Sequence, residues 1–251
     1  MHQCSALIRV AAPLGCIPLL RPHIDSHLAQ YRQELFTAIT DDPPSFLLLG
    51  MALQNRSIYT ECMVHVCGAW PAWPFKTKIK QMMKPQDPLH LLIEKKTVER
   101  DAAILQTEND LMLITIHIPD GTMRRPVKCT DQAWLETWVI VQVFHDHLTY
   151  ALRTLAFDKK ASLKRGVLFR TIHKGVNAYM EYEYARDLCK KIMPLGFKRE
   201  FGQDLKNLKE HAALITRHLA KNELMIDPDQ HDLGYLTCTK IEDADIIWNM
   251  E

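Results

Sequence analysis

Apolar side chains recur at helical spacing along most of this chain, and this pattern limits the possible folds more than any other feature. The clearest case is the stripe Leu205, Leu208, Ala212, Ile215 and Leu219, whose members lie three or four residues apart. Such spacing places apolar residues on one face of an α-helix. Only 9 of the 251 residues are glycine, which disfavours a turn-rich β-sandwich. The sequence therefore predicts an all-α fold.

The same periodicity, together with helix-end signals, predicts where the other helices lie. We expect helices over 23–39, 58–66, 89–114, 132–155, 167–180, 182–193 and 204–222. Two aspartates and two prolines at 41–44 are expected to end the first helix and to start a second, apolar one. Asn55 or Ser57 is expected to cap the helix at 58–66, and Gly68 to end it.

The sequence also predicts a division into two halves. Alternating β-branched residues at 114–118 allow one very short strand in this otherwise helical chain. We expect 119–130 to be a loop that connects a helical half at 1–118 to a second at 131–251. The tail, 232–248, carries aromatic and aliphatic residues and is expected to dock back on the body. The predicted architecture is an irregular multi-helix bundle with two loosely divided halves.

Composition limits the class of protein. Lys and Arg number 31 and Asp and Glu 30, so the net charge of +1 gives no general attraction for nucleic acid or anionic membranes. The longest apolar runs fall well short of the ~20 residues that span a bilayer. Seven cysteines without a disulfide-framework spacing indicate reduced thiols. We therefore expect an intracellular protein, cytoplasmic or nuclear, with no membrane segment.

Cys62, His65 and Cys67 are the strongest candidates for a metal site. On a helix, Cys62 and His65 share a face, but Cys67 is rotated away from both. Because no second pair has a structural-zinc spacing, we favour buried thiols beside a hydrogen-bonded histidine. His145 and His147 would point roughly 200° apart on a helix, so we expect one to face the packing and the other water.

Signatures of catalysis are missing from the sequence. It contains neither a Gly-x-Ser-x-Gly elbow nor a glycine-rich phosphate loop, so we expect a non-enzymatic protein without cofactor or metal. Two alternatives stay open. One is an enzyme or metal-binding protein whose site is assembled from scattered His and Cys residues. The other is a weak nucleic-acid binder that uses the basic loop at 159–165, with Lys159, Lys160, Lys164 and Arg165.

The segment 70–75 contains three aromatic residues and two prolines, a composition that excludes a helix interior. We expect an extended connection whose rings contact neighbouring helices. Exposed aromatic side chains on a rigid scaffold are common anchors of interfaces. Trp70, Trp73 and Phe75 are therefore the candidate partner-binding residues, and the expected partner is a protein of unknown identity.

Several stretches of the sequence resemble one protein family. They are 20–24, 42–44, 58–68, 70–74, 144–146, 178–180, 204–209 and 235–238. The most specific are the Glu-x3-His-x2-Gly segment, formed by Glu61, His65 and Gly68, and the Tyr-Leu-Thr-Cys segment followed by Trp248. Over nearly its whole length the chain resembles the helical region that follows the BTB/POZ domain in filamentous-fungal BTB-domain proteins.

This resemblance implies an all-α extension that acts as a non-catalytic protein-interaction or scaffold module. It also implies that Glu61 and His65 serve a structural hydrogen bond between positions i and i+4. The BTB domain, which normally lies upstream, is not part of this sequence. The chain is accordingly expected to be either a fragment or a member of the family that lost this module.

Overall fold

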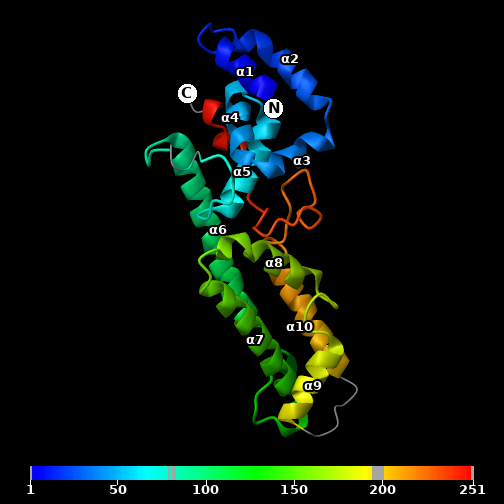
Figure 1. Ribbon diagram of the computed structural model, residues 1–251. Coiled ribbons are helices and arrows are strands. Elements are labelled where there is room, and N and C mark those ends of the chain that lie inside the picture. The colour runs from blue at the N-terminus through cyan, green and yellow to red at the C-terminus, as the bar shows by residue number, and fades with distance from the viewer. Residues whose placement is uncertain (1, 79, 81–82, 194–200, 250–251) are drawn as a thin grey trace. The chain divides into compact units, whose positions relative to one another are not determined.

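The fold is mainly α-helical, as the computed structural model shows for residues 2–78, 80, 83–193 and 201–249 (Figure 1). Across these residues, ten α-helices are accompanied by a single antiparallel pair of short strands. The predicted all-α class, with very little strand, is confirmed. None of the described helices combines the length and the apolar character needed to cross a lipid bilayer.

The chain forms two compact units, and their boundaries differ from the expected ones. Unit 1 combines 1–100 with 222–251, and unit 2 is 101–221. The segment 119–130, expected to divide the halves, lies inside unit 2. The division at 1–118 and 131–251 is not the one observed, because the last thirty residues fold with the N-terminal helices through contacts described below.

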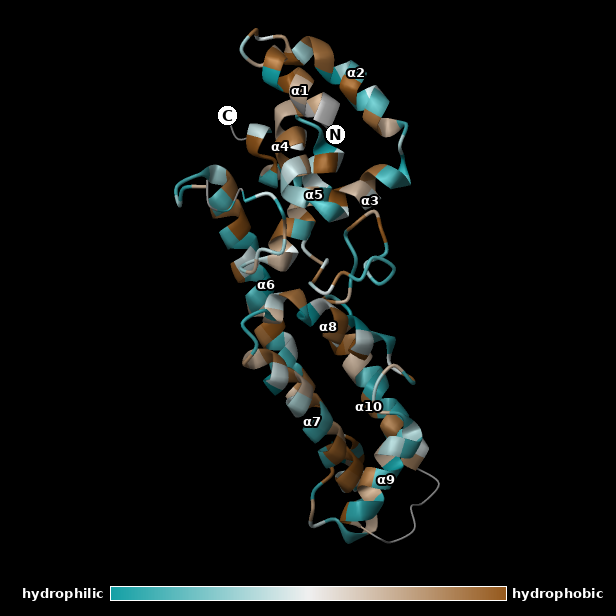
Figure 2. Ribbon diagram, viewed as in Figure 1, coloured by the Kyte–Doolittle hydropathy of each residue, from teal (hydrophilic) through white to brown (hydrophobic). Residues whose placement is uncertain are grey.

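Unit 1 is built from five N-terminal helices and the start of a sixth. They are α1 (His2–Ala11), α2 (Ile17–Ala29), α3 (Gln33–Asp41), α4 (Pro43–Leu53), α5 (Arg56–Ala69) and α6 (Pro88–Met112). The antiparallel neighbours α4 and α5 form its centre, and α2 and α3 pack on them. Helix α4 is apolar on nearly every side, which fits its place in the core (Figure 2). The Asn55 side chain caps α5 as expected, accepting a hydrogen bond of 3.0 Å from the amide of Ile58.

Two local predictions for unit 1 are wrong. The helix expected over 23–39 is broken by a turn, where Arg32 has a φ of 46°. Its apolar spacing continues across the turn because α2 and α3 both face the α4–α5 pair. Gly68 does not end α5, which continues to Ala69. Instead, the missing side chain of Gly68 lets the backbone at Leu236 approach the helix.

Unit 2 continues α6 and adds a hairpin and four helices. These elements are β1 (His117–Asp120), β2 (Met123–Pro126), the 3-10 turns η2 (Gln132–Trp134) and η3 (Ala161–Leu163), and α7 (Leu135–Ala156), α8 (Arg165–Lys174), α9 (Tyr182–Ile192) and α10 (Phe201–Thr216). Helix α10 packs on α7 and α8. The predicted stripe is buried over the length of this helix: Leu205, Leu208 and Ala212 are buried, and Ile215 is half-buried. The helix expected over 204–222 ends earlier, at Thr216, so Leu219 is buried in the segment that follows it.

The hairpin explains why 119–130 is not simply a loop. Gly121, with a φ of 60°, allows the tight turn between β1 and β2. Arg125 on β2 then pairs with Asp131 through two hydrogen bonds of 2.8 and 2.6 Å. The strand expected at 114–118 is therefore observed slightly later and with a partner. Asp131 binds this arginine and does not cap the helix that follows.

One further helix of unit 2, α8, differs from its predicted boundaries. The helix expected over 167–180 is α8, which begins at Arg165, the last residue of the basic loop expected at 159–165, and ends at Lys174. Gly175 follows with a φ of 59°, a conformation that terminates helices. The predicted helix at 182–193 is confirmed by α9.

Candidate functional site

The buried polar side chains of α5 reach the C-terminal tail, 222–249. Both carboxylate oxygens of Glu61 accept from the amide of Met225, at 3.1 and 3.0 Å. Nδ1 of His65 lies 2.6 Å from the hydroxyl of Tyr235. The expected hydrogen bond between Glu61 and His65 is therefore wrong, because each side chain binds a different part of the tail. The expected docking of the tail on the body is confirmed.

Burial shifts the ionisation of both side chains in the direction of the neutral form. It raises the pKa of Glu61 to about 7, although the amide of Met225 acts in the opposite direction. Burial, with a smaller effect of His231, lowers the pKa of His65 to about 3. Glu61 is 2% exposed and His65 0%, so no substrate in solution can reach them as they stand. Their arrangement holds the tail on α5.

Cys62 and Cys67 are fully buried on the same helix. Burial raises the pKa of the Cys67 thiol to about 12 and also raises the pKa of Cys62, so both remain protonated thiols at neutral pH. The prediction of buried thiols near a hydrogen-bonded histidine is confirmed. Within the described ranges, no group of three or more His, Cys, Asp or Glu side chains is arranged to hold a metal ion.

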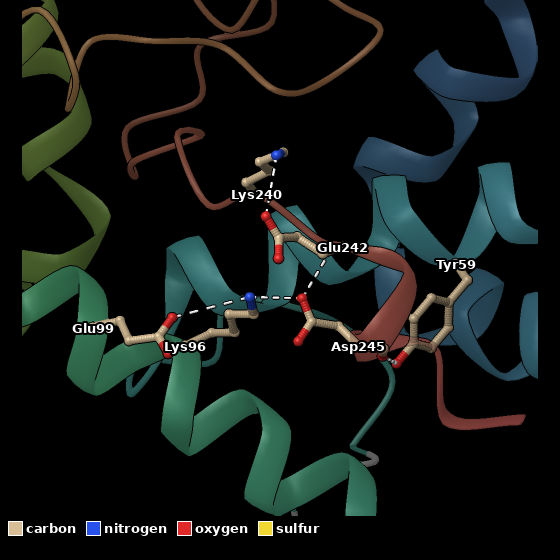
Figure 3. Close-up of polar contacts among 6 residues, drawn as sticks. All are labelled: Tyr59, Lys96, Glu99, Lys240, Glu242 and Asp245. Carbon is tan, nitrogen blue, oxygen red and sulfur yellow. Dashed lines mark hydrogen bonds and ion pairs between the residues drawn. The ribbon is translucent and has the colours of Figure 1, made fainter. Parts of the chain in front are cut away.

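A buried ion pair ties α6 to the same tail (Figure 3). Nζ of Lys96 lies 2.6 Å from Oδ2 of Asp245, and both side chains are largely shielded from solvent. That same carboxylate oxygen accepts from the amide of Glu242 at 2.8 Å. The hydroxyl of Tyr59 donates to the Asp245 carbonyl oxygen at 3.0 Å. Lys96 lies in a run of charged residues, 94–101, a pattern typical of a solvated helix face, yet its side chain is buried.

Arg100, in the same run of charged residues, is also buried and caps the end of α5. Its guanidinium donates to the carbonyl oxygens of Cys67, Gly68 and Trp70, at 3.1 Å for Gly68 and 3.0 Å for Trp70. These carbonyls lie at the negative end of the helix dipole, where a cation is favourable. No sequence signal identifies this role, because the partners lie about thirty residues away in the chain.

The predicted partner-binding residues form an aromatic cluster beside this cap. Trp70 is 8% exposed and packs edge-to-face against Trp73 and His90, with ring centroids 6.1 and 5.6 Å apart. Trp73 is half-buried and packs against Phe75 in the same way at 5.2 Å. The rings contact neighbouring elements as expected. Trp70 offers almost no free surface, whereas Trp73 and Phe75 offer some.

The remaining candidate functional residues from the sequence, two histidines and the basic loop, lie in unit 2 and do not come together in one site. His145 bonds to the carbonyl oxygen of Ile114 at 2.7 Å, and His147 stacks on Tyr179 at 5.8 Å. Both histidines are half-buried, so the expectation that one faces water is wrong. In the basic loop, Lys164 pairs with Asp158 at 2.5 Å.

An apolar groove in unit 1 was not foreseen from the sequence. It has a volume of about 500 Å³ and lies among α1, α2 and α3, with Phe46 of α4. Its lining residues are Cys4, Leu7, Leu20, His23, Ile24, His27, Leu28, Tyr31, Glu34, Leu35, Ala38 and Phe46. Side chains on separate helices make this groove, so no contiguous motif could reveal it.

Comparison of this chain with protein-family models, with curated proteins and with solved structures gave no match.

Proposed function

We propose that this chain is a non-catalytic protein-interaction module, the function that its resemblance to the post-BTB helical region implies. We further propose that the groove of unit 1 is its contact surface. The observation that carries the proposal is an apolar groove of about 500 Å³ bordered by exposed apolar side chains. The aromatic segment 70–75 is a weaker choice, because its first ring, Trp70, is buried.

Helices α1 and α2 and their connection expose an unusual amount of apolar surface. Leu7, which lines the groove, is 51% exposed, and Val10, Leu14 and Leu19 are exposed further along. Single exposed apolar residues are normal on a protein surface, but several within thirteen residues, next to an apolar groove, are characteristic of an interaction site. Solvation of this surface costs free energy that a bound partner would recover.

The chemistry of the lining indicates the kind of partner. Apolar side chains from three helices form the floor, and Glu34 is the carboxylate among the lining residues. A groove of this type suits the apolar face of an amphipathic helix, with anchors at positions i, i+3 or i+4, and i+7. A lysine or arginine at the edge of that face would pair with Glu34. The proposed partner is therefore a protein segment that forms a basic amphipathic helix.

Photocrosslinking with a defined follow-up tests this function. A benzophenone amino acid is placed at position 7, and at Leu105 of unit 2 as an exposed control, in cells that express the chain. The partner peptide crosslinked from position 7 is sequenced, synthesised and titrated against purified protein. We expect a basic amphipathic helix whose affinity falls at least tenfold with Leu7→Glu and is unchanged with Leu105→Glu.

Three results would refute the proposal. The crosslinked peptide could be polar throughout, it could come from a second copy of this chain, or it could bind Leu7→Glu as tightly as the original protein. The matched control matters because Leu7 and Leu105 are both exposed leucines on helices. An equal loss with both variants would show that the peptide binds by general hydrophobicity.

A further inference from the structure

A second cavity lies entirely within unit 2 and contains a buried lysine. Its volume is about 300 Å³, and it is lined by the end of α8, the connection to α9, the first residue of α9 and one face of α10. Leu205, Ala213 and the ring of Tyr182 provide an apolar part of the wall. Lys209 lies in the same wall and is 5% exposed.

The ammonium group of Lys209 has only neutral partners among the described residues. It donates to the carbonyl oxygen of Val176 and lies 5.2 Å from the centroid of the Tyr179 ring. In the described part of the chain, no carboxylate lies within 4.0 Å of its nitrogen. Burial lowers the pKa of Lys209, and the more distant Glu181 acts in the opposite direction. Lysine is rarely buried without a paired anion, because an unpaired charge is costly to desolvate.

The backbone that meets Lys209 is itself in a rare conformation. Val176, which lines the cavity and whose carbonyl oxygen accepts from Lys209, has a φ of 39°, a value that β-branched residues seldom adopt. Strained backbone of this kind concentrates at binding sites, where the surrounding structure holds it. Two independent features, an unpaired buried cation and a strained wall, thus coincide at one cavity.

We propose that this cavity binds a small carboxylic acid with an apolar or aromatic body, whose carboxylate pairs with Lys209. The body of the ligand would lie against Leu205, Ala213 and Tyr182. Lys174 and Lys206 also line the cavity and increase its positive potential, while Glu210 partly offsets them, 3.8 Å from the Lys206 nitrogen. A volume of about 300 Å³ matches the lower end of the range for small-molecule sites.

Titration with matched probes tests this site. Benzoate carries the proposed carboxylate, benzamide is its neutral isostere, and inorganic phosphate is an anion without an apolar body. Methyl NMR spectra of the full chain report binding at Leu205 and Ala213. We expect benzoate to bind at least tenfold more tightly than benzamide or phosphate and to shift these two methyl signals.

Variants at position 209 complete the test. We expect Lys209→Met to abolish the preference for benzoate over benzamide and Lys209→Arg to retain it. Lys95→Met, a substitution at an exposed lysine in unit 1, should leave binding unchanged. Equal binding of benzoate and benzamide, shifts confined to other methyls, or an intact preference in Lys209→Met would overturn the proposal. If Lys209→Met does not fold, Lys209→Arg and the position of the benzoate-induced shifts in the original protein decide the question.

Discussion

Substitution of Gly68 by alanine gives the sharpest test of how the tail docks on α5. A methyl group at this position would overlap the carbonyl oxygen of Leu236 and lie 2.9 Å from Cδ2 of Tyr235. The nearest obstacle is a backbone atom, which cannot rotate away as the end of a flexible side chain can. The tail must therefore shift or detach from the helix.

The magnitude follows from two opposing effects. Alanine is better than glycine inside a helix by about 1 kcal/mol, which favours the variant. Overpacking of a closely packed contact costs about 1–3 kcal/mol, and a displaced tail also weakens the hydrogen bond between Tyr235 and His65. We expect Gly68→Ala to lower the free energy of unfolding by about 2 kcal/mol net.

Gly202→Ala is the matched control, because this glycine also lies in a helix, α10. Its added methyl would lie 3.4 Å from the Tyr182 ring, which is an ordinary contact. We expect no loss of stability there and a gain of up to about 1 kcal/mol.

Urea denaturation measures both variants, and hydrogen exchange followed by mass spectrometry locates the effect. We expect faster exchange across 222–249 in Gly68→Ala, with α7 and α10 unchanged. If Gly68→Ala is as stable as Gly202→Ala and its tail exchanges normally, the close approach of Leu236 to α5 is wrong.

Three further substitutions test the polar contacts of unit 1. Asp245→Asn leaves the buried Lys96 ammonium with only the exposed Glu99 carboxylate, 4.0 Å away, as an anionic partner. We therefore expect the free energy of unfolding, measured by urea denaturation, to fall by about 3 kcal/mol, and to recover in part in the double variant with Lys96→Met. Arg100→Met removes the cap of α5, so we expect the free energy of unfolding to fall by about 2 kcal/mol and the amide hydrogens in the last turn of this helix to exchange faster. Unchanged exchange in that turn would contradict the role of Arg100 as a cap. The pKa of Glu61 in the folded state, about 7, is raised above its ordinary value. The contribution of Glu61 to the free energy of unfolding is therefore present at low pH and is lost as pH rises through 7. We therefore expect Glu61→Gln to be as stable as the original protein near pH 5 and more stable near pH 8. Equal stability of the two proteins at both pH values would contradict the burial of the Glu61 carboxyl group.

The sequence predicted the helices well where their features depend on interactions between residues close together in the chain. The cap by Asn55, the apolar stripe of α10 and the start of α4 at the prolines within 41–44 each depend on residues within a few positions of one another. The turn after α2 escaped prediction because the apolar spacing runs through it without a break.

The candidate site was only partly predictable for the same reason. Glu61, His65 and Gly68 stood out in the sequence, but their partners, Met225, Tyr235 and Leu236, lie more than 160 residues away. Lys96 and Arg100 lie in a run of charged residues, a pattern that is typical of a solvated helix face. Their burial depends on a tail and a helix end that no local window contains.

The sequence by itself determined the class of this protein, since helical periodicity and helix-end residues act over three to seven positions. The tertiary structure alone decided which segments form each unit, where the apolar groove opens and why Lys209 borders a cavity. Those features arise when side chains from distant helices share one space. Burial then fixes their charge state and partners, and a linear pattern does not record burial.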